Sequence, residues 1–262
     1  MNLFLFFEQH PKAAVAFSGG VDSAYLLYAA SQCKAEVKAY YVKTAFQPQF
    51  ELDDAIRLVK ELNIPMQVLT PDVLSSEAVV SNPDDRCYHC KRIIFEEIQK
   101  AAEKDGFTTI LDGTNASDDA GDRPGMRALR ELSVLSPLRE CGLTKDEIRQ
   151  LSREAGLFTW DKPAYACLAT RIPTGERISK EKLEATEEAE KFLFSLGFTD
   201  FRVRRMGDVA KIQVPSRQIP KVIEKRETIT KELKNECIRI IIKGYYRLFL
   251  PEIEAKLRFE MG

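Results

Sequence analysis

Long apolar runs are absent from this chain of 262 residues. Its most apolar stretches, residues 3–7 and 237–242, are far shorter than the ~20 residues that a bilayer crossing requires, so we expect no membrane span. The first stretch also lacks a basic segment and a small-residue cleavage site, which favours a cytoplasmic protein without a secretory signal. Internal repeats and low-complexity segments are missing, and the composition excludes a disordered chain and a disulfide-rich miniprotein.

Dense clusters of positive charge are lacking as well. The formal net charge is −1, with 39 Lys and Arg against 40 Asp and Glu. Residues 1–170 carry a net charge of −6 and residues 171–262 a net charge of +5, which gives the second segment a mild preference for anionic ligands. Because no basic stripe is interleaved with aromatic residues, the sequence favours a small-molecule substrate over a nucleic acid.

Short apolar runs alternate with helical patterns through the first 160 residues. This alternation is typical of a parallel sheet whose strands are joined by right-handed helical crossovers. The last of these helices opens with a Thr144 cap and Glu147 three residues later, the pattern of a capping box. The expected strands are 13–17, 37–42, 66–69, 108–111 and 133–138, and the expected helices are 22–33, 50–62, 88–104 and 144–156.

The rest of the chain follows a different pattern. Residues 161–177 contain two Pro and one Gly without a clear period, which indicates a functional junction loop. Beyond it we expect helices at 179–196 and 216–236 and strands at 201–205, 209–214 and 237–242. The prediction is therefore an α/β fold: a doubly wound, mostly parallel domain over 1–160, the junction over 161–177, and a small α+β domain over 178–262.

A glycine-rich turn, SGGVDS, joins the first expected strand to the first expected helix. Two glycines allow successive backbone N–H groups to point at one spot, and the start of the helix makes that spot electropositive. Such a turn is suited to hold phosphate, with serine hydroxyls as further donors and Asp22 acting through Mg²⁺. A simple helix cap is the alternative. The phosphate-binding residues predicted in this turn are Ser18, Gly19, Gly20, Asp22 and Ser23.

Cys87 and Cys90 lie three residues apart in the first turn of an expected helix, where the positive helix end favours thiolates. Cys167, in the junction, is the natural third member of the set. Three uses fit these thiols: a zinc site completed by His89 or Cys141, a catalytic disulfide, or an iron–sulfur cluster with one open iron. We favour the cluster, because sulfur handling suits an open coordination site. The cysteines expected to be bystanders are Cys33, Cys141 and Cys237.

The SGGVDS turn resembles the PP-loop of the ATP pyrophosphatase superfamily, which implies that ATP and Mg²⁺ are used to adenylate a substrate oxygen. Together with the strings LDGTN, GDRPGMRA and KPAYACLATRIPTGERI, the chain resembles the LarE family. That family consists of sulfurtransferases acting on pyridinium-3,5-biscarboxylic acid mononucleotide, in the biosynthesis of the nickel-pincer cofactor of lactate racemase. The resemblance implies a thiocarboxylate product and a homo-oligomer. Asp112 and Gly113 follow the fourth expected strand, where ligand loops gather on such a sheet, so we expect them to contact the nucleotide; a simple Asp-Gly turn is the alternative.

One group in this family consumes a single junction cysteine as its sulfur source, and another holds a [4Fe-4S] cluster on three cysteines. This chain resembles the second group through Cys87, Cys90 and Cys167, because Ala166 aligns with the consumed cysteine. A slip of the alignment by one position would instead make Cys167 the consumed donor. A cluster that gives up sulfide also requires a separate sulfur source to restore it.

Four arginines are the expected anion-binding groups. Arg123 and Arg171 lie in turns where their planar guanidinium groups can pair with an α-phosphate or with substrate carboxylates. Arg202 and Arg204 alternate along an expected strand, and the resemblance implies a substrate-phosphate site there. The predicted catalytic set is Cys167, Arg171 and Asp22. The competing functions are tRNA thiolation within the same superfamily and a non-catalytic nucleotide-binding protein with structural zinc.

Overall fold

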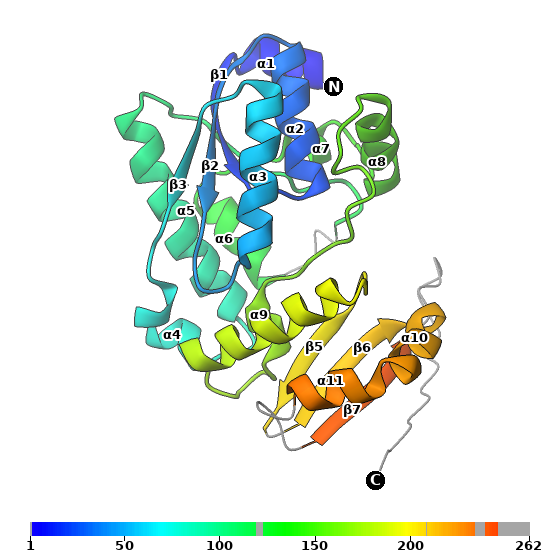
Figure 1. Ribbon diagram of the computed structural model, residues 1–262. Coiled ribbons are helices and arrows are strands. Elements are labelled where there is room, and N and C mark those ends of the chain that lie inside the picture. The colour runs from blue at the N-terminus through cyan, green and yellow to red at the C-terminus, as the bar shows by residue number, and fades with distance from the viewer. Residues whose placement is uncertain (1, 119–122, 208, 234–238, 246–262) are drawn as a thin grey trace. The chain divides into compact units, whose positions relative to one another are not determined.

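The computed structural model describes residues 2–118, 123–207, 209–233 and 239–245 (Figure 1). The chain divides into two compact units, residues 1–162 and 163–262. Among the described residues, no helix combines the length and the hydrophobicity that a bilayer crossing needs.

The first unit alternates strands and helices, as its sequence pattern predicts. Its strands are β1 (Lys12–Phe17), β2 (Glu36–Val42), β3 (Met66–Leu69) and β4 (Ile110–Leu111). Its helices are α1 (Leu3–Gln9), α2 (Val21–Gln32), α3 (Gln49–Leu62), the 3-10 turn η1 (Val73–Ser75), α4 (Glu77–Val80), α5 (Arg86–Lys104), α6 (Pro124–Glu131), α7 (Pro137–Glu140) and α8 (Lys145–Glu154).

The four strands form a parallel sheet in the order β3-β2-β1-β4. Side chains of β1 alternate between two cores. Ala13 and Val15 pack with residues of α1, α2, α3 and α8 on one face, and Ala14 packs with residues of α5 and α6 on the other. The doubly wound α/β fold predicted from the sequence is therefore confirmed.

The chain leaves β1 toward β2 on one side and returns to β4 on the other. The boundary between β1 and β4 is thus the point at which the strand order reverses, and loops at the carboxyl ends of these two strands lie next to each other. In open α/β sheets this is where ligands bind. The glycine-rich turn follows β1, and the LDGTN segment follows β4.

The second unit contains the 3-10 turn η2 (Leu168–Arg171) and the long helix α9 (Lys180–Ser195), followed by a small mixed sheet. In this sheet β5 pairs antiparallel with β6, and β6 pairs parallel with β7. A separate apolar core, with Leu193 and Ile212 fully buried, joins α9 to the sheet. The remaining elements are β5 (Arg202–Met206), β6 (Val209–Pro215), η3 (Ser216–Gln218), α10 (Ile219–Glu224), α11 (Arg226–Leu233) and β7 (Arg239–Tyr245).

Two predicted elements are wrong. The strand expected at 133–138 is reduced to one parallel bridge between Leu135 and Leu111, because Pro137 has no N–H group to continue a ladder and begins α7 instead. The single helix expected at 216–236 is divided into η3, α10 and α11 over its described part. Pro220, in the first turn of α10, cannot donate the backbone hydrogen bond that would continue a helix from Ser216.

The predicted capping box at the start of α8 is present. The Thr144 hydroxyl accepts a hydrogen bond from the Glu147 N–H, and the Glu147 carboxylate accepts one from the Thr144 N–H at 2.8 Å. We expect Thr144→Ala to lower the free energy of unfolding by about 1 kcal/mol, because the amides of the first turn lose their acceptor. Urea denaturation of both proteins measures the difference.

Thr228→Ala is the matched control, because Thr228 is an exposed residue inside α11 and does not cap a helix. Its free energy of unfolding should stay equal to or slightly above that of the unsubstituted protein, since Ala is the better helix former. Equal losses in the two variants would contradict the role of the capping box.

Candidate functional site

The glycine-rich turn is tied together by its two serines. The Ser23 hydroxyl lies 3.0 Å from the Ser18 hydroxyl and accepts a hydrogen bond from the Ser18 N–H at 3.3 Å. Gly19 has φ +74°, and a Cβ there would lie 3.0 Å from the backbone oxygen of Glu51. Only glycine fits this position without strain. Gly20 is the N-cap of α2, so the first amides of the helix face a position that offers no side-chain acceptor of its own.

The loop after β4 packs directly on this turn. A Cβ on Gly113 would lie 2.9 Å from the Ser23 nitrogen, so the two backbones touch because Gly113 has no side chain. The buried Asp112 carboxylate accepts hydrogen bonds from the Ser136 hydroxyl at 2.7 Å and from the hydroxyl and N–H of Thr114. Asp112 therefore shapes its own loop, and Gly113 is the residue that meets the turn.

Asp22 receives two partners from distant segments. The Asn115 amide donates to one carboxylate oxygen at 3.3 Å, and the Lys145 ammonium lies 2.5 Å from the other. Lys145 is the first residue of α8, so the capping box that fixes this helix also fixes the lysine. Sequence reasoning identified Asp22 but missed Lys145, which lies 123 residues further along the chain.

Lys162 is a second lysine that the sequence pattern did not reveal. Its ammonium lies 2.7 Å from the Asp54 carboxylate and donates to the backbone oxygen of Gly19 at 3.2 Å. The guanidinium of Arg149 holds the backbone oxygens of Trp160 and Lys162, at 2.6 and 2.8 Å. Two lysine ammonium groups therefore border the glycine-rich turn, which adds positive charge where an anion is expected.

Arg123 lies at the N-terminal end of α6 and is exposed. Helix α6 packs along α5, since a Cβ on Gly125 would contact the Lys91 side chain and the Arg127 guanidinium lies 4.0 Å from the Tyr88 ring. The structure thus places Arg123 on the helix that covers the first turns of α5. Its expected contact with an anion stays a prediction.

Cys87 is exposed and Cys90 is half-buried in the first turn of α5. The buried Arg86 guanidinium lies 3.8 Å from the Cys87 sulfur and donates to the Asn82 side chain at 2.5 Å. The Arg86 guanidinium and the N-terminal end of α5 therefore place positive charge beside the Cys87 sulfur.

Cys167 belongs to the second unit, where it is half-buried at the start of η2. Within the residues that the structure describes, no three His, Cys, Asp or Glu side chains gather as a metal site. The expected bystanders Cys33 and Cys141 pack against the core of the first unit, where burial raises the pKa of both thiols. Cys237 lies outside the described residues.

Arg171 lies in the interior of the second unit, with a side chain 0% exposed. Its Nε donates to the Glu190 carboxylate at 2.9 Å, and its Nη1 donates to the backbone oxygen of Ala166 at 2.7 Å. Burial alone would lower the pKa of Arg171, but the hydrogen bonds and charge of Glu190 outweigh it and raise that pKa. A guanidinium held this way faces its own unit, which disfavours the direct anion contact expected from the sequence.

Arg202 and Arg204 alternate on β5, as predicted. The Arg204 guanidinium donates to the Gln213 side chain at 2.6 Å and to the backbone oxygen of Thr170 at 2.9 Å. Burial lowers the pKa of Arg204, and the positive charges of Arg202 and Arg171 lower it further. An anion bound beside these cations would relieve their repulsion, which keeps a phosphate site on β5 physically reasonable.

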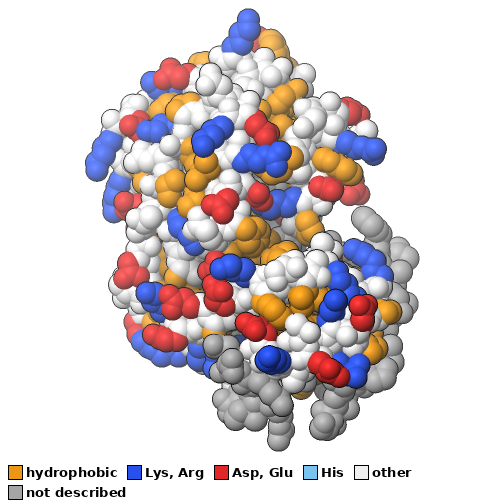
Figure 2. All heavy atoms as spheres, viewed as in Figure 1, with side chains coloured by type: hydrophobic (Ala, Val, Ile, Leu, Met, Phe, Trp, Pro, Cys, Tyr) orange, Lys and Arg blue, Asp and Glu red, His pale blue; other side chains and the backbone are white. Residues whose placement is uncertain are grey.

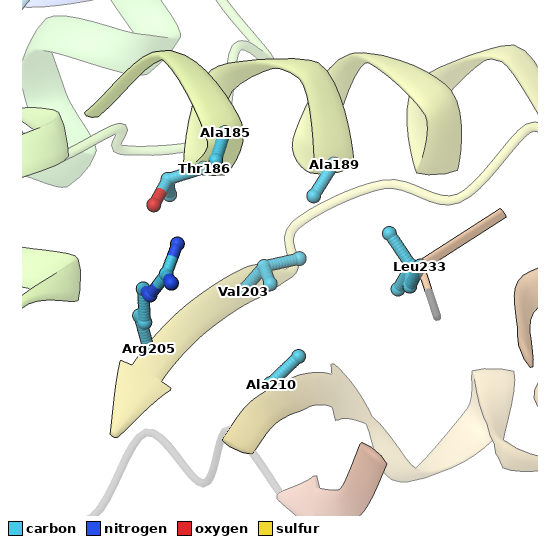
Figure 3. A pocket seen from close by; sticks show the side chains of 7 residues that line it. All are labelled: Ala185, Thr186, Ala189, Val203, Arg205, Ala210 and Leu233. Carbon is cyan, nitrogen blue, oxygen red and sulfur yellow. The ribbon is translucent and has the colours of Figure 1, made fainter. Parts of the chain in front are cut away.

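A small apolar pocket lies between α9 and the strands β5 and β6 in the same unit (Figure 3). Small side chains of Ala185 and Ala189 line it from the helix, and Arg205 is its one charged member among the described lining residues. None of the predicted site residues contributes to it. On the face shown in Figure 2, Lys and Arg side chains are interspersed with Asp and Glu, without a continuous basic stripe.

Comparison with known proteins gives a consistent result. The family model of the queuosine biosynthesis protein QueC matches residues 12–87, from β1 to the start of α5. Pyridinium-3,5-bisthiocarboxylic acid mononucleotide synthase of Lactiplantibacillus plantarum is 31% identical over 232 residues, which cover 88% of this chain and 84% of that protein.

Two further relatives are uncharacterized proteins of similar coverage. That of Synechocystis sp. is 35% identical over 85% of this chain and 84% of its own length, and that of Methanocaldococcus jannaschii is 32% identical over 91% and 93%. The L. plantarum match spans both units, so the similarity extends far beyond the glycine-rich turn. The chain therefore belongs to the LarE family of ATP-dependent sulfurtransferases within the PP-loop superfamily.

Proposed function

We propose that this protein adenylates a carboxylate of pyridinium-3,5-biscarboxylic acid mononucleotide and converts it to a thiocarboxylate, a step in making the nickel-pincer cofactor of lactate racemase. The observation that carries the nucleotide half is the backbone contact between Gly113 and Ser23, which joins the glycine-rich turn to the β4 loop at the carboxyl edge of the sheet. The substrate comes from the family relationship to the L. plantarum synthase.

The glycine-rich turn would hold the phosphates of ATP. Its backbone amides and the hydroxyls of Ser18 and Ser23 are donors, and Lys145 and Lys162 supply positive charge at its border. Asp22 is the carboxylate that would bind Mg²⁺, releasing Lys145 toward the phosphates. A substrate carboxylate oxygen then attacks the α-phosphorus, pyrophosphate leaves, and the acyl adenylate carries AMP as a good leaving group.

The substrate's own phosphate would bind to Arg202 and Arg204 on β5, and Arg123 is the further candidate anion ligand. The arginine pair lies on one face of the strand beside η2, which begins at Cys167. Phosphate binding there would bring the reacting carboxylate to the cysteine-bearing segment.

Cys87, Cys90 and Cys167 are the ligands that would hold a [4Fe-4S] cluster with one open iron. Thiols are the groups that ligate such clusters, and Arg86 with the N-terminal end of α5 places positive charge beside the first of them, Cys87. When bound, such a cluster supplies a replaceable sulfide that can displace AMP. In the other family route the sulfur of Cys167 itself would be transferred and the cysteine lost.

The central test uses the full chain, reconstituted anaerobically with iron and sulfide and incubated with ATP, Mg²⁺ and the pyridinium dicarboxylate mononucleotide. We expect mass spectrometry to show a product in which oxygen has been replaced by sulfur, and an intact polypeptide. A polypeptide that has lost H₂S at Cys167 would identify the consumed-cysteine route. Absence of any thiolated product would overturn the substrate assignment.

Gly113→Ala should weaken the binding of ATP·Mg²⁺ about tenfold, because a Cβ 2.9 Å from the Ser23 nitrogen forces the glycine-rich turn to move. Isothermal titration calorimetry measures the dissociation constant. Gly125→Ala is the control, since its Cβ meets only the flexible Lys91 side chain at 3.2 Å. Unchanged affinity in Gly113→Ala would contradict the placement of ATP on this turn.

Cys87→Ala should lose most of the iron and acid-labile sulfide that the unsubstituted chain retains after reconstitution, because three thiolates hold such a cluster. Cys141→Ala, which replaces a core-packed thiol, should retain both. Stoichiometric zinc without acid-labile sulfide in the purified protein would instead support the structural zinc alternative.

A further inference from the structure

Glu190 is a buried carboxylate at the centre of the second unit. It lies on α9, with a side chain only 2% exposed, and it accepts hydrogen bonds from several segments. Arg171 donates through Nε at 2.9 Å and Nη2 at 3.2 Å, the Val203 N–H donates at 2.8 Å, and the Tyr165 hydroxyl donates to the same carboxylate. A buried charge is tolerated only when it is paired in this way, so the position of the carboxylate is fixed.

The third guanidinium nitrogen of Arg171, Nη1, contacts the segment that contains Cys167. Nη1 donates to the backbone oxygen of Ala166 at 2.7 Å and to the Thr170 hydroxyl at 2.9 Å. The backbone oxygen of Cys167 accepts hydrogen bonds from the Thr170 N–H at 3.0 Å and the Thr170 hydroxyl at 2.9 Å. The peptides on both sides of the Cys167 α-carbon are therefore anchored.

Tyr165 adds a third constraint two residues before the cysteine. Its ring lies against the Arg171 guanidinium, 4.5 Å from centroid to carbon, while its hydroxyl reaches Glu190. Residues 165–171 thus wrap around one buried cation, and that cation is held by one carboxylate from a different element. The neighbouring apolar core already packs α9 against β5, so that packing does not depend on this ion pair.

We propose that Glu190 and Arg171 are positioning residues for Cys167. Glu190 fixes the Arg171 guanidinium, the guanidinium fixes the Ala166 peptide, and the Cys167 sulfur is thereby presented in one direction. The inference rests on the proposed function in that it takes Cys167 to be the working thiol of the junction. A sulfur that must bind iron or reach a substrate carbonyl needs its geometry set by such supporting contacts.

The test separates positioning from folding by replacing both partners. The double variant Arg171→Met/Glu190→Met exchanges a buried ion pair for apolar side chains of similar length, a change that buried pairs commonly tolerate. We expect a folded chain with a lower melting temperature, because the Val203 N–H and the Tyr165 hydroxyl lose their acceptor. Alkylation of Cys167 by iodoacetamide, measured by peptide mass spectrometry on the iron-free full chain at one pH, should be about fivefold faster, as expected for one lost backbone hydrogen bond.

Cys141 in the same samples is the internal reference, and its alkylation rate should not change. Glu188→Gln is the matched control, because Glu188 lies on the same helix with a side chain 70% exposed. If the double variant does not fold, Arg171→Gln/Glu190→Gln takes its place with the same expected direction, because it leaves no unpaired charge and keeps an acceptor for the Val203 N–H. After reconstitution, the variants should also retain less iron than Glu188→Gln.

A folded double variant with unchanged Cys167 alkylation and unchanged iron content would overturn the positioning role. The alkylation readout is taken without iron, so it judges positioning even if the unsubstituted chain binds no cluster. If the unsubstituted chain binds no cluster, the cluster proposal is contradicted and the positioning proposal is not. If alkylation accelerates but iron content is unchanged, the positioning of Cys167 holds and its part in the cluster does not.

Discussion

The backbone contact between Gly113 and Ser23 is the constraint on which the arrangement of the glycine-rich turn and the β4 loop depends. It exists because β1 and β4 are parallel neighbours, so their carboxyl ends meet at one edge of the sheet and the loops that follow them meet as well. Any side chain at position 113 would separate the two loops. With the loops in contact, Asn115 reaches Asp22 across 93 residues of sequence, and the turn acquires a second wall.

Charge is organised around this turn by pairing each lysine with a carboxylate. Lys145 pairs with Asp22 and Lys162 pairs with Asp54. Each ammonium charge beside the turn is therefore balanced by a carboxylate, which reduces the repulsion between the two lysines. The second unit also pairs a cation with a carboxylate, here in its interior. The Glu190 carboxylate compensates the charge of the buried Arg171 guanidinium. Arg202 and Arg204 add positive charge on β5, where the Arg204 guanidinium is held by the Gln213 side chain and the Thr170 backbone oxygen.

The five cysteines that the structure describes differ in their environment. Cys33 and Cys141 lie against apolar core residues, where burial disfavours the thiolate. Cys87 and Cys90 lie near the start of α5, with the buried Arg86 guanidinium beside Cys87, and Cys167 precedes η2 in a segment whose backbone is anchored by Arg171. Cys33 and Cys141 are therefore suited to packing, which leaves the other three for the metal or sulfur chemistry that we propose.

Local sequence was enough for several features that depend on neighbouring residues. The alternation of apolar strands and helices, the SGGVDS turn, the capping box at Thr144 and the two-residue spacing of Arg202 and Arg204 follow from periodicity and backbone preference. The strand expected at 133–138 failed for a local reason too, because Pro137 overrides an apolar pattern.

Tertiary structure decided which distant groups became partners. Lys145 and Lys162 reach the glycine-rich turn, and Glu190 reaches Arg171, through pairings that no spacing along the chain reveals. The sequence predicts that Arg171, in a turn of the junction, binds an anion, whereas the fold places its side chain in the interior of the second unit. The physical reason is that a charge is buried only where the fold brings it an opposite charge, and that depends on packing rather than on local pattern.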